Sequence, residues 1–147
     1  MADYRGVLET AKSPEDVFGY MADFRNAAEW DPATVSIAQT AGAGAGPGAR
    51  YRLVTRFMGR PVTLDYETIG FKPIDELVLA FKGGTVEGTD TVAIASSDGT
   101  SSNARTRLVY SVEFNLSWRW LTPLVVPFFD RAADNALAGL ARALEGR

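Results

Sequence analysis

The most regular hydrophobic pattern lies at the end of the chain, over residues 121–144, which read LTPLVVPFFDRAADNALAGLARAL. Apolar side chains recur there at steps of three, four and five, mostly the spacing of one face of an α-helix. They are Leu124, Val125, Phe128, Ala132, Leu137, Leu140 and Leu144. Thr122 is a candidate N-cap before Pro123, whereas Pro127 predicts a kink or an offset first turn. The pattern predicts a long amphipathic helix that lies against an apolar surface.

A period-two alternation, typical of strands with one buried face, fills the chain from residue 50 to residue 116. With two further strands at residues 4–11 and 34–41, it predicts about seven antiparallel strands. Gly59-Arg60 and Ser97-Asp98-Gly99-Thr100 are among the turn signals between them. The side chains predicted to face inward are Tyr51, Leu53, Phe57, Val62, Leu64, Tyr66, Leu77, Leu79, Phe81, Val92, Ile94, Leu108, Tyr110, Val112 and Phe114.

Two short helices are predicted between the first and second strands. Ser13 is a suitable cap before Pro14, and residues 23–30 form the second helix, which ends at Asp31-Pro32. The element order indicates an α+β fold, in which a curved antiparallel sheet of about seven strands wraps around the long C-terminal helix. No repeat divides the chain, so we expect residues 1–147 to form a single domain.

Composition excludes several classes of function. The chain is 46% hydrophobic and 22% charged, with a net charge of −3 and no basic run, which disfavours nucleic-acid binding. It has no cysteine and no histidine, so disulfides, Cys/His zinc sites and imidazole-based triads are excluded. Any proton transfer would use Asp, Glu, Tyr, Lys or Arg. We therefore expect no metal and no cofactor.

The N-terminal segment MADYRGVLET lacks the features of a signal peptide, and the longest apolar run, LVVPFF, is far short of the ~20 residues of a membrane span. A cytoplasmic protein without an integral membrane segment is expected. The glycine-rich stretch at residues 42–48, GAGAGPG, precedes a strand and is not followed by GK[ST], so it predicts a hairpin loop and not a phosphate site.

Several segments in this order resemble the START/Bet v 1-like (SRPBCC) superfamily, and within it the polyketide cyclase/dehydrase branch. They are SPEDVFGYMADFRNAAEWDP, GARYRLVTRFMGRPVTLDYE, TDTVAI and the closing amphipathic helix. The resemblance covers nearly the whole chain. It implies a helix-grip fold that encloses an elongated apolar cavity between the sheet and the C-terminal helix. Members of such families bind lipids, sterols, polyketides or other flat hydrophobic molecules, and a minority catalyse cyclisation, dehydration or hydrolysis.

Asp90 is the candidate acid/base residue, because it shares the parity of Val92 and Ile94 and should point toward the helix. A buried, unpaired carboxyl has a raised pKa and can transfer protons near neutral pH. The alternative is a structural role, in which Asp90 lies at the end of the strand and either caps a turn or pairs with an arginine. Tyr66 and Tyr110 are the candidate hydrogen-bond donors beside it, although both also suit a core role.

The remaining candidates form the walls of the expected cavity. The predicted ligand-binding residues are Trp30, Tyr51, Leu53, Phe57, Leu64, Leu79, Phe81, Val92, Leu108, Val112, Phe128, Ala132, Ala136 and Leu140. Trp118 and Trp120 either shape one mouth of the cavity, pack, or form an exposed patch. Asp65 and Glu67 should point outward and make cross-strand ion pairs with Arg52 and Arg56.

Three functions are compatible with these patterns. The first is binding of a small hydrophobic, lipid- or polyketide-like molecule by a monomer or homodimer. The second is a polyketide aromatase/cyclase or dehydratase that uses Asp90 and the tyrosines. The third is an interaction module that docks through residues 118–129.

Overall fold

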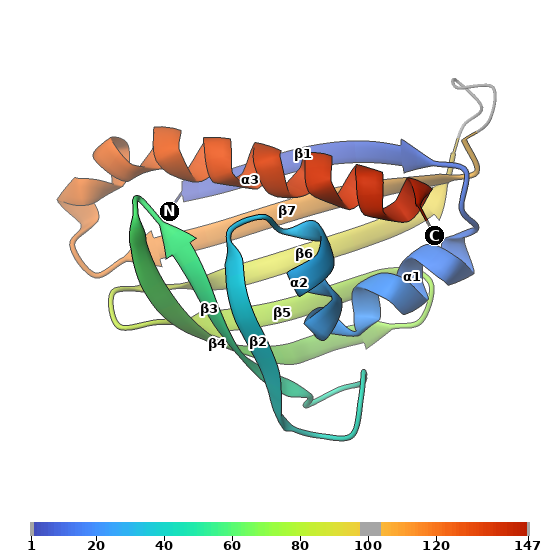
Figure 1. Ribbon diagram of the computed structural model, residues 1–147, viewed down its shortest axis with the longest axis horizontal. Coiled ribbons are helices and arrows are strands. Elements are labelled where there is room, and N and C mark those ends of the chain that lie inside the picture. Colours follow the sequence, from blue (N-terminus) through green and yellow to red (C-terminus); the bar gives the residue numbers. More distant parts are fainter. Residues whose placement is uncertain (1, 98–103, 147) are drawn as a thin grey trace.

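The computed structural model describes residues 2–97 and 104–146, which form an antiparallel seven-stranded sheet and a long helix (Figure 1). The strand order is β1-β7-β6-β5-β4-β3-β2. The strands are β1 (Ala2–Thr10), β2 (Thr34–Ala41), β3 (Arg50–Phe57), β4 (Arg60–Lys72), β5 (Glu76–Lys82), β6 (Val86–Ser96) and β7 (Thr106–Leu116). The helices are α1 (Pro14–Ala22), η1 (Phe24–Asn26), α2 (Ala27–Trp30), η2 (Arg119–Leu121) and α3 (Thr122–Glu145).

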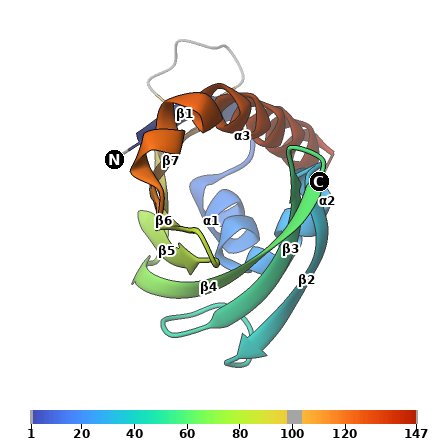
Figure 2. The ribbon, with the colours of Figure 1, turned by 90° about the vertical axis from the view of Figure 1, so that its left-hand side faces the viewer.

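The sheet curls around one side of α3, as Figure 2 shows in the view along the helix. Helices α1 and α2 lie on the same side of the sheet as α3, and α3 packs along β1 and against α2. The core lies between these elements, because most inward side chains of the strands from β3 to β7 are buried there. The predicted α+β, helix-grip arrangement with two short helices after the first strand is confirmed.

The entry helices begin as the capping signal predicts. The Ser13 side chain accepts a hydrogen bond from the Asp16 backbone N–H at 3.2 Å, and Pro14 is the first residue of α1. The second expected helix is instead two pieces, the 3₁₀ turn η1 and the single turn α2. Asp23 separates α1 from η1, because its backbone is extended and its carboxylate caps the Arg25 N–H at 3.1 Å.

The hairpin between β3 and β4 turns through two residues with positive φ, Met58 at 53° and Gly59 at 80°. This is the backbone of a two-residue turn that matches the twist of the flanking strands. It sets the register in which Tyr51 lies opposite Tyr66 and Leu53 opposite Leu64, all four on the inner face. The turn expected at residues 98–100 lies outside the described residues.

The closing helix differs from its prediction at its N-terminus. Thr122 is already helical, and Leu121 occupies the N-cap position without a side-chain cap, because η2 leads the chain directly into α3. Thr122 as the N-cap was therefore wrong. The helix is continuous from Thr122 to Glu145 with Pro127 inside it, so no separate first turn precedes this proline within α3.

Gly139 fixes the place where α3 meets α2. A Cβ atom at this position would overlap the backbone oxygen of Trp30, far inside van der Waals contact. Only glycine permits this approach, which brings the buried side chains of Leu140 and Leu144 against the core. The junction also positions Trp30 beside the inner face of the sheet, where it contacts Tyr110.

Candidate functional site

A carboxyl–phenol pair lies on the inner face of the sheet, on the adjacent strands β6 and β7. Tyr110 donates a hydrogen bond from its hydroxyl to Oδ2 of Asp90 at 2.8 Å. The register places Val92 opposite Tyr110 and Val112 opposite Asp90, so the two polar side chains meet diagonally across the strands. Strict alternation along β6 makes Asp90 face inward, as the sequence predicted.

The Asp90 carboxyl is buried, with 4% of the residue exposed. Removal from water disfavours its charged form and raises its pKa to about 7. The hydrogen bond from Tyr110 opposes this shift, and the negative charge of Asp31 adds to it. Asp90 therefore changes its protonation state near neutral pH, which an exposed aspartate does not.

Tyr66, on β4, completes the polar group. Burial and the charges of Asp90 and Asp31 raise its pKa well above the ordinary value, so it stays a neutral hydrogen-bond donor. Its hydroxyl has no hydrogen-bond partner among the described residues. Among the described residues, Thr34 Oγ1 and Tyr51 OH are the only side-chain polar atoms that are both inaccessible to water and without a hydrogen-bond partner. The Tyr66 hydroxyl is therefore not sealed from water.

An aromatic shell surrounds these groups. Trp30 packs edge-on against Tyr110 with ring centroids 6.1 Å apart, and Tyr66 lies between Phe24 at 4.5 Å and Phe81 at 5.4 Å. Tyr51 packs against Phe24 from the other side at 5.8 Å. The three polar tips of Asp90, Tyr66 and Tyr110 thus lie in otherwise apolar surroundings.

Sequence reasoning missed Phe24 and Asp31. Phe18, Met21 and Phe24 are buried at intervals of three residues, although Phe24 lies beyond the helix that carries the other two. This spacing was the only sequence signal for Phe24. Asp31 follows the buried Trp30, and its Oδ1 accepts a hydrogen bond from the Ala33 backbone N–H at 3.0 Å. Burial raises its pKa, and this hydrogen bond opposes the rise. Its position before Pro32 pointed to a helix end and not to a half-buried carboxyl whose charge acts on Asp90.

Tyr51 is fully buried but does not join Asp90. Burial raises its pKa, and the charge of Asp23 adds to this, whereas Asp90 does not act on it. It contributes its ring to the aromatic shell and not its hydroxyl to the polar group.

Most of the other predicted wall residues lie on the inner side of the molecule. The buried ones are Trp30, Leu53, Leu64, Leu79, Phe81, Val92, Leu108, Val112 and Leu140. Phe57, Ala132 and Ala136 are half-buried. Phe128 was predicted wrongly, because it is 52% exposed. Its neighbour Phe129 takes the inward position and packs on Phe114 at 4.4 Å, and the next residue on a helix points about 100° away.

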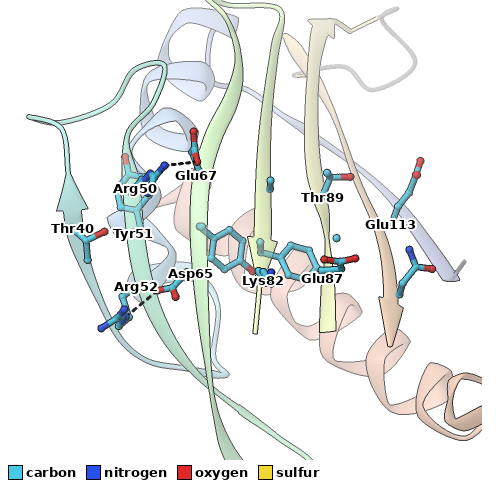
Figure 3. A pocket seen from close by; sticks show the side chains of 15 residues that line it. Thr40, Arg50, Tyr51, Arg52, Asp65, Glu67, Lys82, Glu87, Thr89 and Glu113 are labelled. Carbon is cyan, nitrogen blue, oxygen red and sulfur yellow. Dashed lines mark hydrogen bonds and ion pairs between the residues drawn. The ribbon is translucent and has the colours of Figure 1, made fainter. Parts of the chain in front are cut away.

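The outer face of the sheet carries paired charges. Arg52 Nε lies 3.0 Å from Asp65, and Arg50 lies 3.2 Å from Glu67, as dashed lines mark in Figure 3. The predicted cross-strand pairing is therefore correct for Arg52, whereas Arg50 takes the place expected for Arg56. These side chains line an open groove of about 700 Å³ that runs over the outer face.

Two smaller hollows lie near α3. One, of about 520 Å³, is lined by Ala2, Leu116 and the first turns of α3. The other, of about 430 Å³, lies between α2 and α3, where Asp31 and Arg142 are both in its wall. Trp118 and Trp120, just before α3, are 60% and 72% exposed, so they form an exposed patch and not part of the core.

No metal site or membrane span is formed by the described part of the chain. Residues 2–97 and 104–146 contain no group of three or more Asp or Glu side chains placed to hold a metal ion. Within the same residues, no helix has the length and apolar character needed to cross a membrane.

Comparisons with known proteins agree with this architecture. Residues 1–145 match the family described as polyketide cyclase/dehydrase and lipid transport. No sequence among curated proteins matches the chain. Solved structures that share the fold at low identity include three proteins, and the chain covers nearly all of each.

The Zhui aromatase/cyclase from Streptomyces sp. R1128 is 16% identical, with a TM-score of 0.78 over 98% of this chain and 93% of that chain. A protein from Thermus thermophilus is 18% identical, with a TM-score of 0.78 over 99% and 98%. A START superfamily protein from Mycobacterium smegmatis is 19% identical, with a TM-score of 0.73 over 99% and 95%. The chain therefore belongs to the polyketide cyclase/dehydrase and lipid transport family and has the helix-grip fold.

Proposed function

We propose that this protein binds a small hydrophobic molecule between the inner face of the sheet and α3. The observation that carries the proposal is the Asp90–Tyr110 pair at 2.8 Å beside the unpaired hydroxyl of Tyr66. The surrounding aromatic side chains would contact the apolar body of the ligand. The three polar tips would orient its polar end, as a few convergent polar groups do in ligand pockets.

The energetics of the site support a role in binding. Burying a carboxyl that no cation pairs with costs free energy, and an apolar side chain of similar size would be more stable there. The Tyr66 hydroxyl likewise gains no hydrogen bond from the described residues. Such groups are strongly perturbed mainly where a protein uses them. The description of the family, which includes lipid transport, points in the same direction.

A second candidate function is acid/base catalysis, favoured by the pKa of Asp90 at about 7. The carboxylate would accept a proton from a carbon next to a carbonyl, while Tyr66 donates a hydrogen bond to the carbonyl oxygen. The protonated Asp90 would then give this proton to the hydroxide that leaves the neighbouring carbon, so that water departs, a carbon–carbon double bond forms and Asp90 returns to its carboxylate form. The fold shared with the aromatase/cyclase is compatible with this chemistry but does not by itself select it.

Native mass spectrometry of the protein purified from its own host tests the binding proposal. We expect a fraction of the protein to carry one hydrophobic molecule of defined mass. Asp90→Asn should lower that fraction, whereas the outer-face control Asp65→Asn should retain it. A ligand-free spectrum in repeated preparations, or equal retention by both variants, would contradict the assignment of this site.

The same variants separate binding from catalysis. A synthetic β-hydroxy ketone with a naphthyl group would lose water to give an enone, which is followed by absorbance. Catalysis predicts that Asp90→Asn falls to the uncatalysed rate while Asp65→Asn keeps the rate of the original protein. If the original protein does not exceed the uncatalysed rate with any ketone that it binds, the binding function alone stands.

A further inference from the structure

We infer that the interior site selects a hydrophobic amine, whose ammonium group lies at Asp90, and that it rejects carboxylates. This inference rests on the proposed function and names the class of its ligand. It depends on three features of the described residues: the sign of the buried charges, the open hydrogen-bonding capacity, and the aromatic surfaces around them.

The first feature is the sign of the charge. Asp90 is buried on the inner face, and the charge of Asp31 reaches it. No Lys or Arg of the described residues contributes to the pKa of Asp90. Arg50 and Arg52 pair with carboxylates on the outer face, and Arg142 shares only the separate hollow with Asp31. When it is ionised, the buried Asp90 carboxyl therefore attracts a cation and repels an anionic ligand, because no cationic side chain of the described residues offsets its charge.

The second feature is unused hydrogen-bonding capacity. Tyr110 occupies only Oδ2 of Asp90, so Oδ1 has no side-chain partner among the described residues. Tyr66 is 9% exposed, its hydroxyl has no hydrogen-bond partner among the described residues, and the charges of Asp90 and Asp31 act on it. An ammonium group has three donors and no acceptor, so it fits one carboxylate oxygen and one hydroxyl oxygen.

The third feature is the set of aromatic rings. Trp30 and Tyr110 lie together at 6.1 Å, and Tyr66 is enclosed by Phe24 and Phe81. Ring faces attract cations, and this attraction grows when water is removed. A carboxylate would gain nothing from these faces and would meet two negative charges. The apolar part of an amine would pack on the same rings.

A matched series of naphthalene probes tests the inference: 1-naphthylmethylamine, 1-naphthylmethanol and 1-naphthoic acid. Their affinities are measured at pH 8 by calorimetry with the full chain. We expect the amine to bind at least tenfold more tightly than the alcohol, and the carboxylate to bind most weakly. Asp90→Asn should reduce the amine to the affinity of the alcohol, and Asp65→Asn should leave the order unchanged.

Lowering the pH from 8 to 6 gives an independent readout, because it protonates Asp90 while the amine stays charged. The groups that act on Asp90 are Tyr110 and Asp31; its strand partners Leu79 and Val112 carry no charge. We expect the amine to lose up to about tenfold in affinity over this range, since the anionic fraction of a group titrating near pH 7 falls about tenfold. The alcohol should change much less.

Each outcome has a definite meaning. An alcohol as tight as the amine would overturn the role of charge, and a tighter carboxylate would overturn the negative site. Amine binding that survives in Asp90→Asn, or that is equal at both pH values, would place the ammonium elsewhere. If none of the three probes binds, the proposed function itself fails for flat ligands of this size, which is a different result from a wrong preference among them.

Discussion

Asp90 and Asp65 are the same residue type on two strands of one sheet, yet one faces the protein interior and the other faces water. Asp90 points inward from β6, is 4% exposed, and has only a tyrosine hydroxyl as its partner. Asp65 points outward from β4, where its side chain is 61% exposed and lies 3.0 Å from Arg52. The inner carboxyl has its pKa raised to about 7 by burial. The difference teaches that strand parity, more than residue type, decides which acid is available for function.

The largest effect that follows from this comparison is that Asp90 lowers the free energy of unfolding by an amount that depends on pH. The pKa of Asp90 is higher in the folded protein than in the unfolded chain. The favourable contribution of Asp90 to the free energy of unfolding is therefore complete below about pH 4 and is lost as the pH rises through 7. Since one pKa unit corresponds to about 1.4 kcal/mol, the loss reaches about 4 kcal/mol at pH 8. Asp90→Asn should therefore become more stable, relative to the original protein, by about this amount between pH 4 and pH 8.

Urea unfolding at several pH values measures this difference, and Asp65→Asn provides the control. The comparison with the variant at each pH removes the contributions of other groups, such as Asp31, whose pKa burial also raises. A stability difference between Asp90→Asn and the original protein that does not change with pH would show that Asp90 is already charged or paired in the folded state.

A smaller effect is expected from removal of the hydrogen bond. Tyr110→Phe deletes the donor that lowers the pKa of Asp90, so the pKa should rise further and the unfolding free energy at pH 8 should fall by about 1–2 kcal/mol. At pH 4.5, where Asp90 is protonated, the loss should be smaller. The matched control is Tyr4→Phe, because Tyr4 donates to Asp134 at the same 2.8 Å but in an exposed setting.

The control should cost well under 1 kcal/mol, since water replaces an exposed partner. Equal losses in the two variants would mean that burial does not strengthen the Tyr110–Asp90 bond. An increase in the stability of Tyr110→Phe would mean that burying the tyrosine hydroxyl costs more free energy than its hydrogen bond to Asp90 contributes.

The smallest effect is expected on the outer face. Asp65→Asn breaks the exposed ion pair with Arg52 and should cost about 0.5 kcal/mol or less at low salt. The loss should disappear at 1 M salt, where screening removes the attraction. Thermal unfolding at both salt concentrations measures it, and a loss above about 2 kcal/mol that persists at high salt would show that the outer groove is more than a solvated face.

Periodicity predicted much of the fold because it is a local property. Alternation placed Asp90, Tyr66 and Tyr110 on the inner face, and the cap at Ser13 predicted where α1 begins. The error at Phe128 arose because two adjacent phenylalanines compete for one inward position on the helix. Phe128 matched the apolar stripe of α3, but Phe129 one residue later packs on Tyr4 and Phe114 and rotates Phe128 outward.

The sequence by itself determined the inner and outer faces of the strands, the order of the elements and the absence of cysteine and histidine chemistry. It also predicted the fold family that the comparisons show. Only the tertiary structure decided which inward groups meet. The diagonal contact of Tyr110 with Asp90, the approach of Asp31 after α2, and the packing of Phe24 on Tyr66 join residues far apart in the chain. Parity fixes the side toward which a residue points, but strand register and helix docking fix its partners, and those depend on the whole fold.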